Sequence, residues 1–222
     1  MKTLRHMATR VREPVNAYTH MAGALLSILA LVLLIHKSVL VGQPTHILAF
    51  TIFGSSMVLL YLASSFYHML PASEKGIRVL RRIDHIMIYI LIAGTYTPIA
   101  LIVLEGFLGW ALFTAVWSIA VLGVIFKLVW FQAPKWVSLL LYLSMGWMAI
   151  LVFPALWQVF SFSAFAWILM GGLTYTIGAL IYGFKWPNPS PLYFDFHAIW
   201  HIMVMAGSFC FFWLMYRYVI YY

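Results

Sequence analysis

Charged residues are scarce in this sequence, and their scarcity limits the class of protein it can encode. Only 8% of the 222 residues are Asp, Glu, Lys or Arg, whereas 65% are hydrophobic. Soluble globular domains carry about 25% charged residues, so this chain has too little polar surface to cover a globule in water. A soluble enzyme is excluded. Intrinsic disorder is excluded as well, because 18% of the residues are aromatic and disordered segments contain few aromatic residues.

Cysteine and alternating polarity are also nearly absent. The single cysteine, Cys210, has no partner for an intramolecular disulfide. Membrane barrels need strands of about 10 residues that alternate in polarity, whereas the apolar runs here are continuous and of about the 20 residues that a spanning helix requires. We expect an all-α polytopic membrane protein, one domain over residues 1–222 with a basic segment at 1–15. Its seven transmembrane helices should lie near residues 17–36, 46–70, 83–104, 110–131, 136–157, 164–184 and 194–216.

The positive charges indicate how the chain crosses the membrane. The predicted spans place eleven of the thirteen Lys and Arg residues on one side and two, Lys37 and Arg217, on the other. Cytoplasmic loops carry the excess of positive charge, which predicts a cytoplasmic N-terminus and, with seven spans, an external C-terminus. This distribution explains the net charge of +8 without a nucleic-acid partner. The eleven residues are Lys2, Arg5, Arg10, Arg12, Lys75, Arg78, Arg81, Arg82, Lys127, Lys135 and Lys185.

Ionisable side chains within apolar spans are costly and usually mark a functional site. His197 and His201 stand four residues apart, on one face of the seventh predicted helix. The predicted topology places them in the same leaflet as His68 and Asp84, within about three helical turns of the cytoplasmic surface. Three neutral imidazoles with a water or a carboxylate complete a four-coordinate zinc site. The alternative is a set of interfacial histidines that are hydrogen-bonded to carbonyl groups.

The start of the first predicted span is also polar. Asn16 is placed to cap the helix, because Asn is among the preferred N-cap residues. His20, one turn further on, could hydrogen-bond towards the polar cluster or support a metal ligand. Simple capping and interfacial anchoring are an equally good interpretation of Glu13, Asn16 and His20.

Together these motifs resemble the hemolysin III family, the bacterial branch of the progestin and adiponectin receptor group. The resemblance spans essentially the whole chain. It implies seven helices in the bacterial inner membrane and a zinc ion bound by His68, His197 and His201, with Asp84 holding a water beside the metal and Ser64 supporting His68 from one turn below. The matching segments are Glu13-x-x-Asn16-x-x-Thr19-His20, Ser64-x-x-x-His68, Arg82-Ile83-Asp84-His85, Ala93-Gly94-Thr95-Tyr96-Thr97-Pro98 and His197-x-x-x-His201.

The predicted site is compatible with functions of different classes. The resemblance implies a zinc-dependent hydrolase of a lipid amide or ester, in which Asp84 acts as base and Ser64 as a hydrogen-bond donor. The second is a non-catalytic sensor or regulator of membrane state, in which zinc holds the second, third and seventh helices together. Cytolysis, which the family name suggests, is a weaker third candidate because few charges line the spans. A membrane lipid is the expected substrate or ligand.

Overall fold

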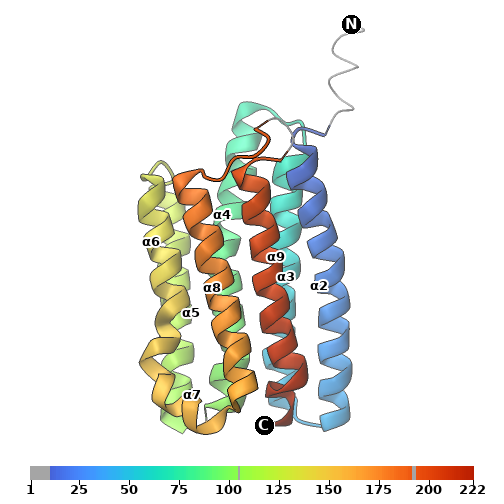
Figure 1. The fold of residues 1–222 in the computed structure, drawn as a ribbon, viewed down its shortest axis with the longest axis vertical. Helices are drawn as coiled ribbons and strands as arrows, with labels where there is room; N and C mark the ends of the chain where they lie inside the picture. Colours follow the sequence, from blue (N-terminus) through green and yellow to red (C-terminus); the bar gives the residue numbers. More distant parts are fainter. Residues whose placement is uncertain (1–10, 105, 192–193) are drawn as a thin grey trace, which may run out of the picture.

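The structure is a computed structural model that describes residues 11–104, 106–191 and 194–222, and these residues form a bundle of long helices (Figure 1). The start of α2 and the C-terminus lie at opposite ends of the bundle. Residues 1–10 of the predicted basic segment lie outside the described residues. The helices are α2 (Pro14–Val41), α3 (Pro44–Met69), α4 (Glu74–Pro98), η1 (Ile99–Val103), α5 (Gly106–Val129), α6 (Lys135–Gly146), η2 (Trp147–Val152), α7 (Phe153–Val159), α8 (Phe162–Phe184), α9 (Phe196–Arg217) and η3 (Val219–Tyr221).

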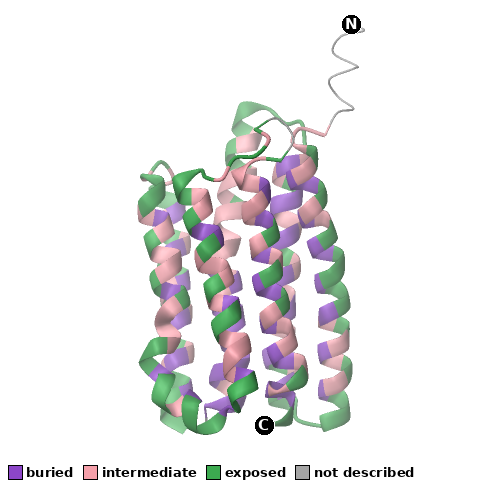
Figure 2. Cartoon of the chain, in the orientation of Figure 1, coloured by how far each residue is buried: buried purple, intermediate pink, exposed green. Residues whose placement is uncertain are grey.

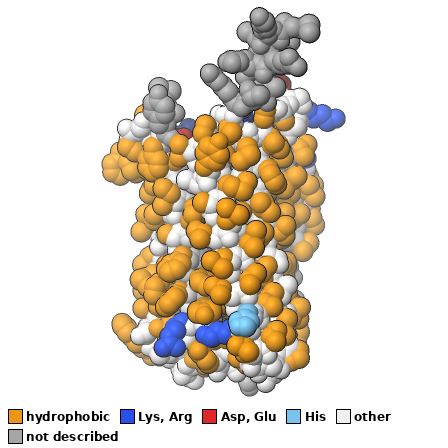
Figure 3. Space-filling view, turned by 90° about the vertical axis from the view of Figure 1, so that its right-hand side faces the viewer, with side chains coloured by type: hydrophobic (Ala, Val, Ile, Leu, Met, Phe, Trp, Pro, Cys, Tyr) orange, Lys and Arg blue, Asp and Glu red, His pale blue; other side chains and the backbone are white. Residues whose placement is uncertain are grey.

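The all-α class and the seven spans predicted from the sequence are confirmed. Within the described residues, seven helical segments are long and apolar enough to cross a membrane. Their buried positions face the neighbouring helices (Figure 2), and many large apolar side chains are exposed on the outside of the bundle. On the face shown in Figure 3, hydrophobic side chains cover the middle of the bundle and charged side chains gather near its ends, as a lipid environment requires. The orientation across the membrane stays a prediction.

The start of α4 and the course of the fifth span differ most from the prediction. Helix α4 begins at Glu74 rather than near Ile83, because the Ser73 side chain accepts a hydrogen bond from the Gly76 backbone N–H and caps the helix. The basic residues between Lys75 and Arg82, which were expected in a loop, therefore lie on the first turns of α4. The fifth predicted span is not one continuous α-helix, since the 3-10 segment η2 separates α6 from α7.

The helices leave a cavity inside the bundle. Helix α2 packs against α3 and α9, α3 packs against α4, and α8 packs against α9. A cavity of about 810 Å³ lies inside the bundle, and every helix from α2 to α9 contributes to its lining, with η1 and η2 between them. Its lining begins with Arg81 and Lys135 and continues to Phe153 and Leu156, so it follows most of the length of the fifth span. Most of the side chains that line it are hydrophobic.

Candidate metal centre

Three histidines converge at the end of the bundle where α2 begins. His68 lies in the last turn of α3, and His197 and His201 lie one turn apart at the start of α9. One ring nitrogen from each lies within 4.8 Å of the other two, and no other group of this kind occurs among the described residues. The ring centroids are 4.8 to 4.9 Å apart and the rings are steeply inclined to one another. Such a triangle of imidazole nitrogens could hold a metal ion.

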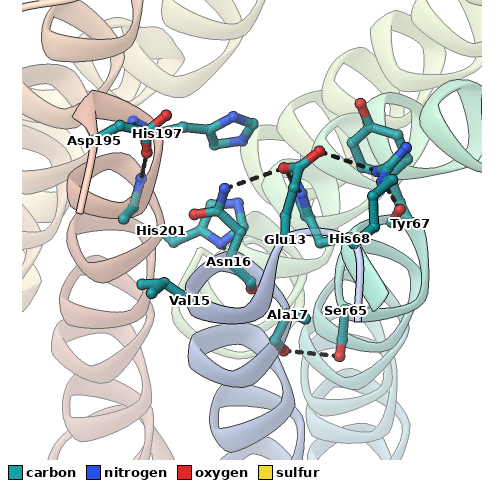
Figure 4. Close-up of polar contacts among 12 residues, drawn as sticks. Glu13, Val15, Asn16, Ala17, Ser65, Tyr67, His68, Asp195, His197 and His201 are labelled. Atoms are coloured by element: carbon teal, nitrogen blue, oxygen red, sulfur yellow. Dashed lines mark hydrogen bonds and ion pairs between the residues drawn. The ribbon is translucent and has the colours of Figure 1, made fainter. Parts of the chain in front are cut away.

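A carboxylate fixes the proton of His68. The Glu13 Oε2 atom lies 2.6 Å from His68 Nδ1, and Asn16 Nδ2 donates to the same oxygen at 3.2 Å (Figure 4). Burial alone would raise the pKa of Glu13, but the hydrogen bond and charge of His68, the Asn16 amide and the charge of Arg12 lower that pKa to about 2. A carboxylate can only accept a hydrogen bond, so Nδ1 is the nitrogen of His68 that carries a proton. The Nε2 atom is buried without a hydrogen-bond partner among the described residues, and in the neutral ring that a metal ion binds it is the nitrogen with the free lone pair.

His201 is held in a similar way by α2. Its Nδ1 atom lies 3.2 Å from the Asn16 carbonyl oxygen and 3.4 Å from Thr19 Oγ1. An Nδ1–H that donates to a backbone carbonyl leaves Nε2 as the free ligand atom, the arrangement that is usual for metal-bound histidines. His201 is 1% exposed, so water does not compete for this hydrogen bond.

His197 is the most exposed of the three histidines. It is half-buried and lines the cavity. The Asp195 side chain accepts hydrogen bonds from the backbone N–H groups of His197 and Ala198 at 3.1 and 2.9 Å, which fixes the start of α9 and with it the position of His197 (Figure 4). Asp195 was not among the predicted site residues, although an Asp just before an apolar run is a recognised N-cap signal.

Asp84 and Ser64 lie beside the histidines but outside the triangle. Asp84 is half-buried on α4, and its carboxyl is a neighbour of Ser64 and His68. Both Asp84 and Ser64 line the cavity, as do His197 and His201. Asp84 is not one of the three groups whose ligand atoms approach one another within 4.8 Å. A carboxylate in this position can interact with a molecule in the cavity.

The α2 residues take other roles than helix capping. The prediction of Asn16 as N-cap is wrong, because α2 begins at Pro14 and Glu13 precedes it. Pro is favoured in the first position of a helix, where its missing N–H needs no partner. Of the two roles considered for His20, the hydrogen bond towards the polar cluster is absent, because neither ring nitrogen has a hydrogen-bond partner among the described residues. Instead the His20 ring stacks on that of His201.

The comparisons with known proteins agree with the family that the sequence motifs indicate. A family profile described as "Haemolysin-III related" matches residues 8–212. The chain belongs to this family. Over 220 residues it is 40% identical to "Hemolysin-3" of Bacillus cereus, covering 98% of this chain and 96% of that protein. Identity to the "Hemolysin-3 homolog" of Bacillus subtilis is 42% over 202 residues, or 91% and 92% of the two chains.

The family also has relatives in animals. The human "Monocyte to macrophage differentiation factor" is 26% identical over 221 residues, which cover 97% of this chain and 87% of that protein. Membership in the haemolysin-III related family and the seven apolar helices together make the chain an integral membrane protein.

Proposed function

We propose that this protein is a zinc-dependent hydrolase of a lipid amide or ester. The observation that carries the proposal is the position of the histidine triangle, which borders an apolar cavity whose wall also contains Asp84 and Ser64. An amphiphile could place its hydrocarbon chain in this cavity and its amide or ester bond beside the histidines.

The residues present fit a zinc ion. Three imidazoles are a known ligand set of catalytic zinc, in which the fourth position stays open. The buried, unpartnered Nε2 atom of His68 and the Nδ1 contacts of His68 and His201 match what neutral histidine ligands need. The chemistry that zinc supplies in such a site is a lowered pKa of water and a polarised carbonyl group.

The chain's own side chains supply the remaining functions. The Asp84 carboxylate is placed to take the proton from an attacking water, and a positioned base of this kind contributes about 10²- to 10⁴-fold to a rate. The Ser64 hydroxyl, 1% exposed, can donate a hydrogen bond to the developing oxyanion. The hydrophobic wall of the cavity orients the substrate and excludes water from the bond that breaks.

The test combines metal content with turnover. We expect the purified protein to contain about one zinc ion per chain, and His68→Ala, His197→Ala and His201→Ala each to lose it. Ceramides, lysolipids and acyl esters are then offered to the zinc-loaded protein, and release of free fatty acid is measured before and after chelation. Fatty acid released only by the zinc-loaded protein supports the hydrolase. A fully loaded protein that cleaves nothing in the panel contradicts it and favours a zinc ion that only holds α3 and α9 together.

A further inference from the structure

Lys127 is buried where a charged side chain has little to stabilise it. It lies in the last turn of α5 and is 2% exposed. Its ammonium donates to the Ser138 hydroxyl of α6 at 2.5 Å, and in the part of the chain that the structure describes this is its one hydrogen bond, although an ammonium has three N–H donors. Burying a cation without a counter-charge costs free energy. An anion bound beside Lys127 would offset this cost.

Other cations gather around the same point. The ring of Phe131 has the Arg81 guanidinium carbon 5.7 Å, the Arg82 guanidinium carbon 5.1 Å and the Lys127 Nζ atom 5.9 Å from its centroid. The aromatic face attracts each cation, but it does not neutralise them. No carboxylate of the described residues lies within 4.0 Å of any of the three.

The positive-inside rule alone does not account for the burial of Lys127. A charge that sets topology needs only to lie near the end of a span, and the exposed Lys75 and Arg78 meet that need. Buried Lys127, half-buried Arg81 and exposed Lys135 all line the cavity, at the end where Asp84 and His197 also lie. Three cations therefore border an apolar cavity in which the opposite charge is supplied by Asp84 alone among the described acidic residues.

We propose that Arg81, Lys127 and Lys135 bind the phosphate group of a single-chain lipid whose hydrocarbon chain occupies the cavity. A phosphate monoester carries a charge of about −1.5 to −2 at neutral pH and three acceptor oxygens, which matches three cations better than a singly charged carboxylate does. The planar Arg guanidinium binds phosphate oxygens in pairs, and a cavity of about 810 Å³ is large enough for an alkyl chain. The inference deepens the proposed function, because it names the anionic class of lipid that the cavity receives.

Binding of defined probes to the full-length protein in a neutral maltoside detergent tests the inference. Dodecyl phosphate, laurate, dodecanol and inorganic phosphate are titrated, and the thermal unfolding midpoint and tryptophan fluorescence are recorded. We expect dodecyl phosphate to raise the midpoint by several degrees and to bind at least tenfold more tightly than the other three. Equal binding of dodecanol would contradict the headgroup site, equal binding of laurate would contradict the preference for phosphate, and equal binding of inorganic phosphate would contradict the lipid.

Matched variants locate the site. Arg81→Gln and Lys135→Gln should each weaken dodecyl phosphate binding about tenfold, and neither change disturbs a fully buried side chain. Lys75→Gln and Arg78→Gln remove the same charge from exposed positions that do not line the cavity, so they should bind dodecyl phosphate as the wild type does. Equal weakening in all four variants would show a general charge effect and overturn the site. Because the readout is binding, a failure here is distinct from an absence of hydrolysis, which bears only on the proposed function.

Discussion

The imidazole ring of His20 lies flat against the ring of His201, with 3.5 Å between the centroids and 6° between the planes. His20 is itself held by Tyr61, whose ring meets it edge-on at 5.0 Å and whose hydroxyl donates to Ser208 at 2.6 Å. The Asn16 carbonyl oxygen lies 3.2 Å from His201 Nδ1 and fixes how the His201 ring is turned within its own plane. Helix α2 therefore orients a ligand of the candidate metal centre without contributing one of the three histidines.

Removing the His20 ring should weaken metal binding. His20→Ala takes away the surface on which His201 rests, and we expect zinc affinity to fall about 10- to 100-fold, the range for loss of a group that orients a ligand. His20→Phe keeps a flat ring and should bind zinc almost as the wild type does. Zinc retained at increasing chelator concentration measures the effect. His46→Ala, a buried histidine on the opposite end of the bundle, is the control. Unchanged affinity in His20→Ala would show that the stacking has no part in metal binding.

Neutralising Glu13 should weaken the same centre by a different route. Glu13→Gln keeps the size of the side chain but removes the charge that holds the proton on His68 Nδ1, so zinc affinity should again fall about 10- to 100-fold. Glu74→Gln removes an exposed carboxylate that only approaches Arg78 at 3.9 Å and should leave the affinity unchanged. Competition between the protein and a fluorescent zinc chelator measures both. Equal zinc affinities of Glu13→Gln and Glu74→Gln would contradict this role of Glu13.

The sequence predicted those parts of this structure that depend on composition and spacing. Seven apolar runs became seven spans because spanning helices have no other way to satisfy their backbone in lipid. The i, i+4 spacing of His197 and His201 already places both on one face of a helix, and the charge distribution placed His68 at the same depth. The three histidines and their common depth could therefore be predicted. The contact between α3 and α9 that brings them together cannot be derived from spacing within either helix.

Other features depend on packing between helices and were not predictable. The stacking of His20 on His201 requires the angle between α2 and α9, and the burial of Lys127 requires Ser138 of α6 beside it. The start of α4 was placed nine residues late because its first turns are polar, so the hydrophobic pattern missed them. The cap at Ser73 followed by Glu74 is a local signal that could have corrected this boundary.

Close packing between α8 and α9 predicts opposite effects at two adjacent glycines. A Cβ atom on Gly171 would lie 2.6 Å from the Phe211 ring, whereas one on Gly172 would meet nothing within 4 Å. The Phe211 ring stacks on Tyr175 and cannot easily move away. Gly171→Ala should lower the free energy of unfolding by about 1 to 3 kcal/mol, and Gly172→Ala should leave it unchanged or raise it by up to about 1 kcal/mol. Thermal or denaturant unfolding in detergent measures both, and equal destabilisation would contradict the packing.

The orientation of the bundle can be tested with reporters at its two ends. The excess of Lys and Arg predicts that the start of α4, near Lys75, faces the cytoplasm and that the C-terminus after Tyr222 faces outward. Alkaline phosphatase, which is active only outside the cytoplasm, should therefore be active when fused after Tyr222. A green fluorescent protein at that position should stay dark, and one inserted between Leu70 and Ala72, in the linker before α4, should fluoresce. The reverse pattern would show that the histidine triangle lies in the outer leaflet.

A variant of Asp84 can distinguish a catalytic metal ion from one that only holds helices together. Asp84→Asn keeps the size of the side chain, but an amide cannot take a proton. Since Asp84 is not part of the histidine triangle, zinc content and unfolding midpoint should stay close to those of the wild type. If Asp84 is the base, the release of fatty acid from the best substrate should fall by about 10²-fold or more. Ser64→Ala should retain zinc as well and lower turnover by about 10²-fold through loss of an oxyanion donor. An Asp84→Asn protein that holds zinc and keeps wild-type turnover would exclude Asp84 as the base.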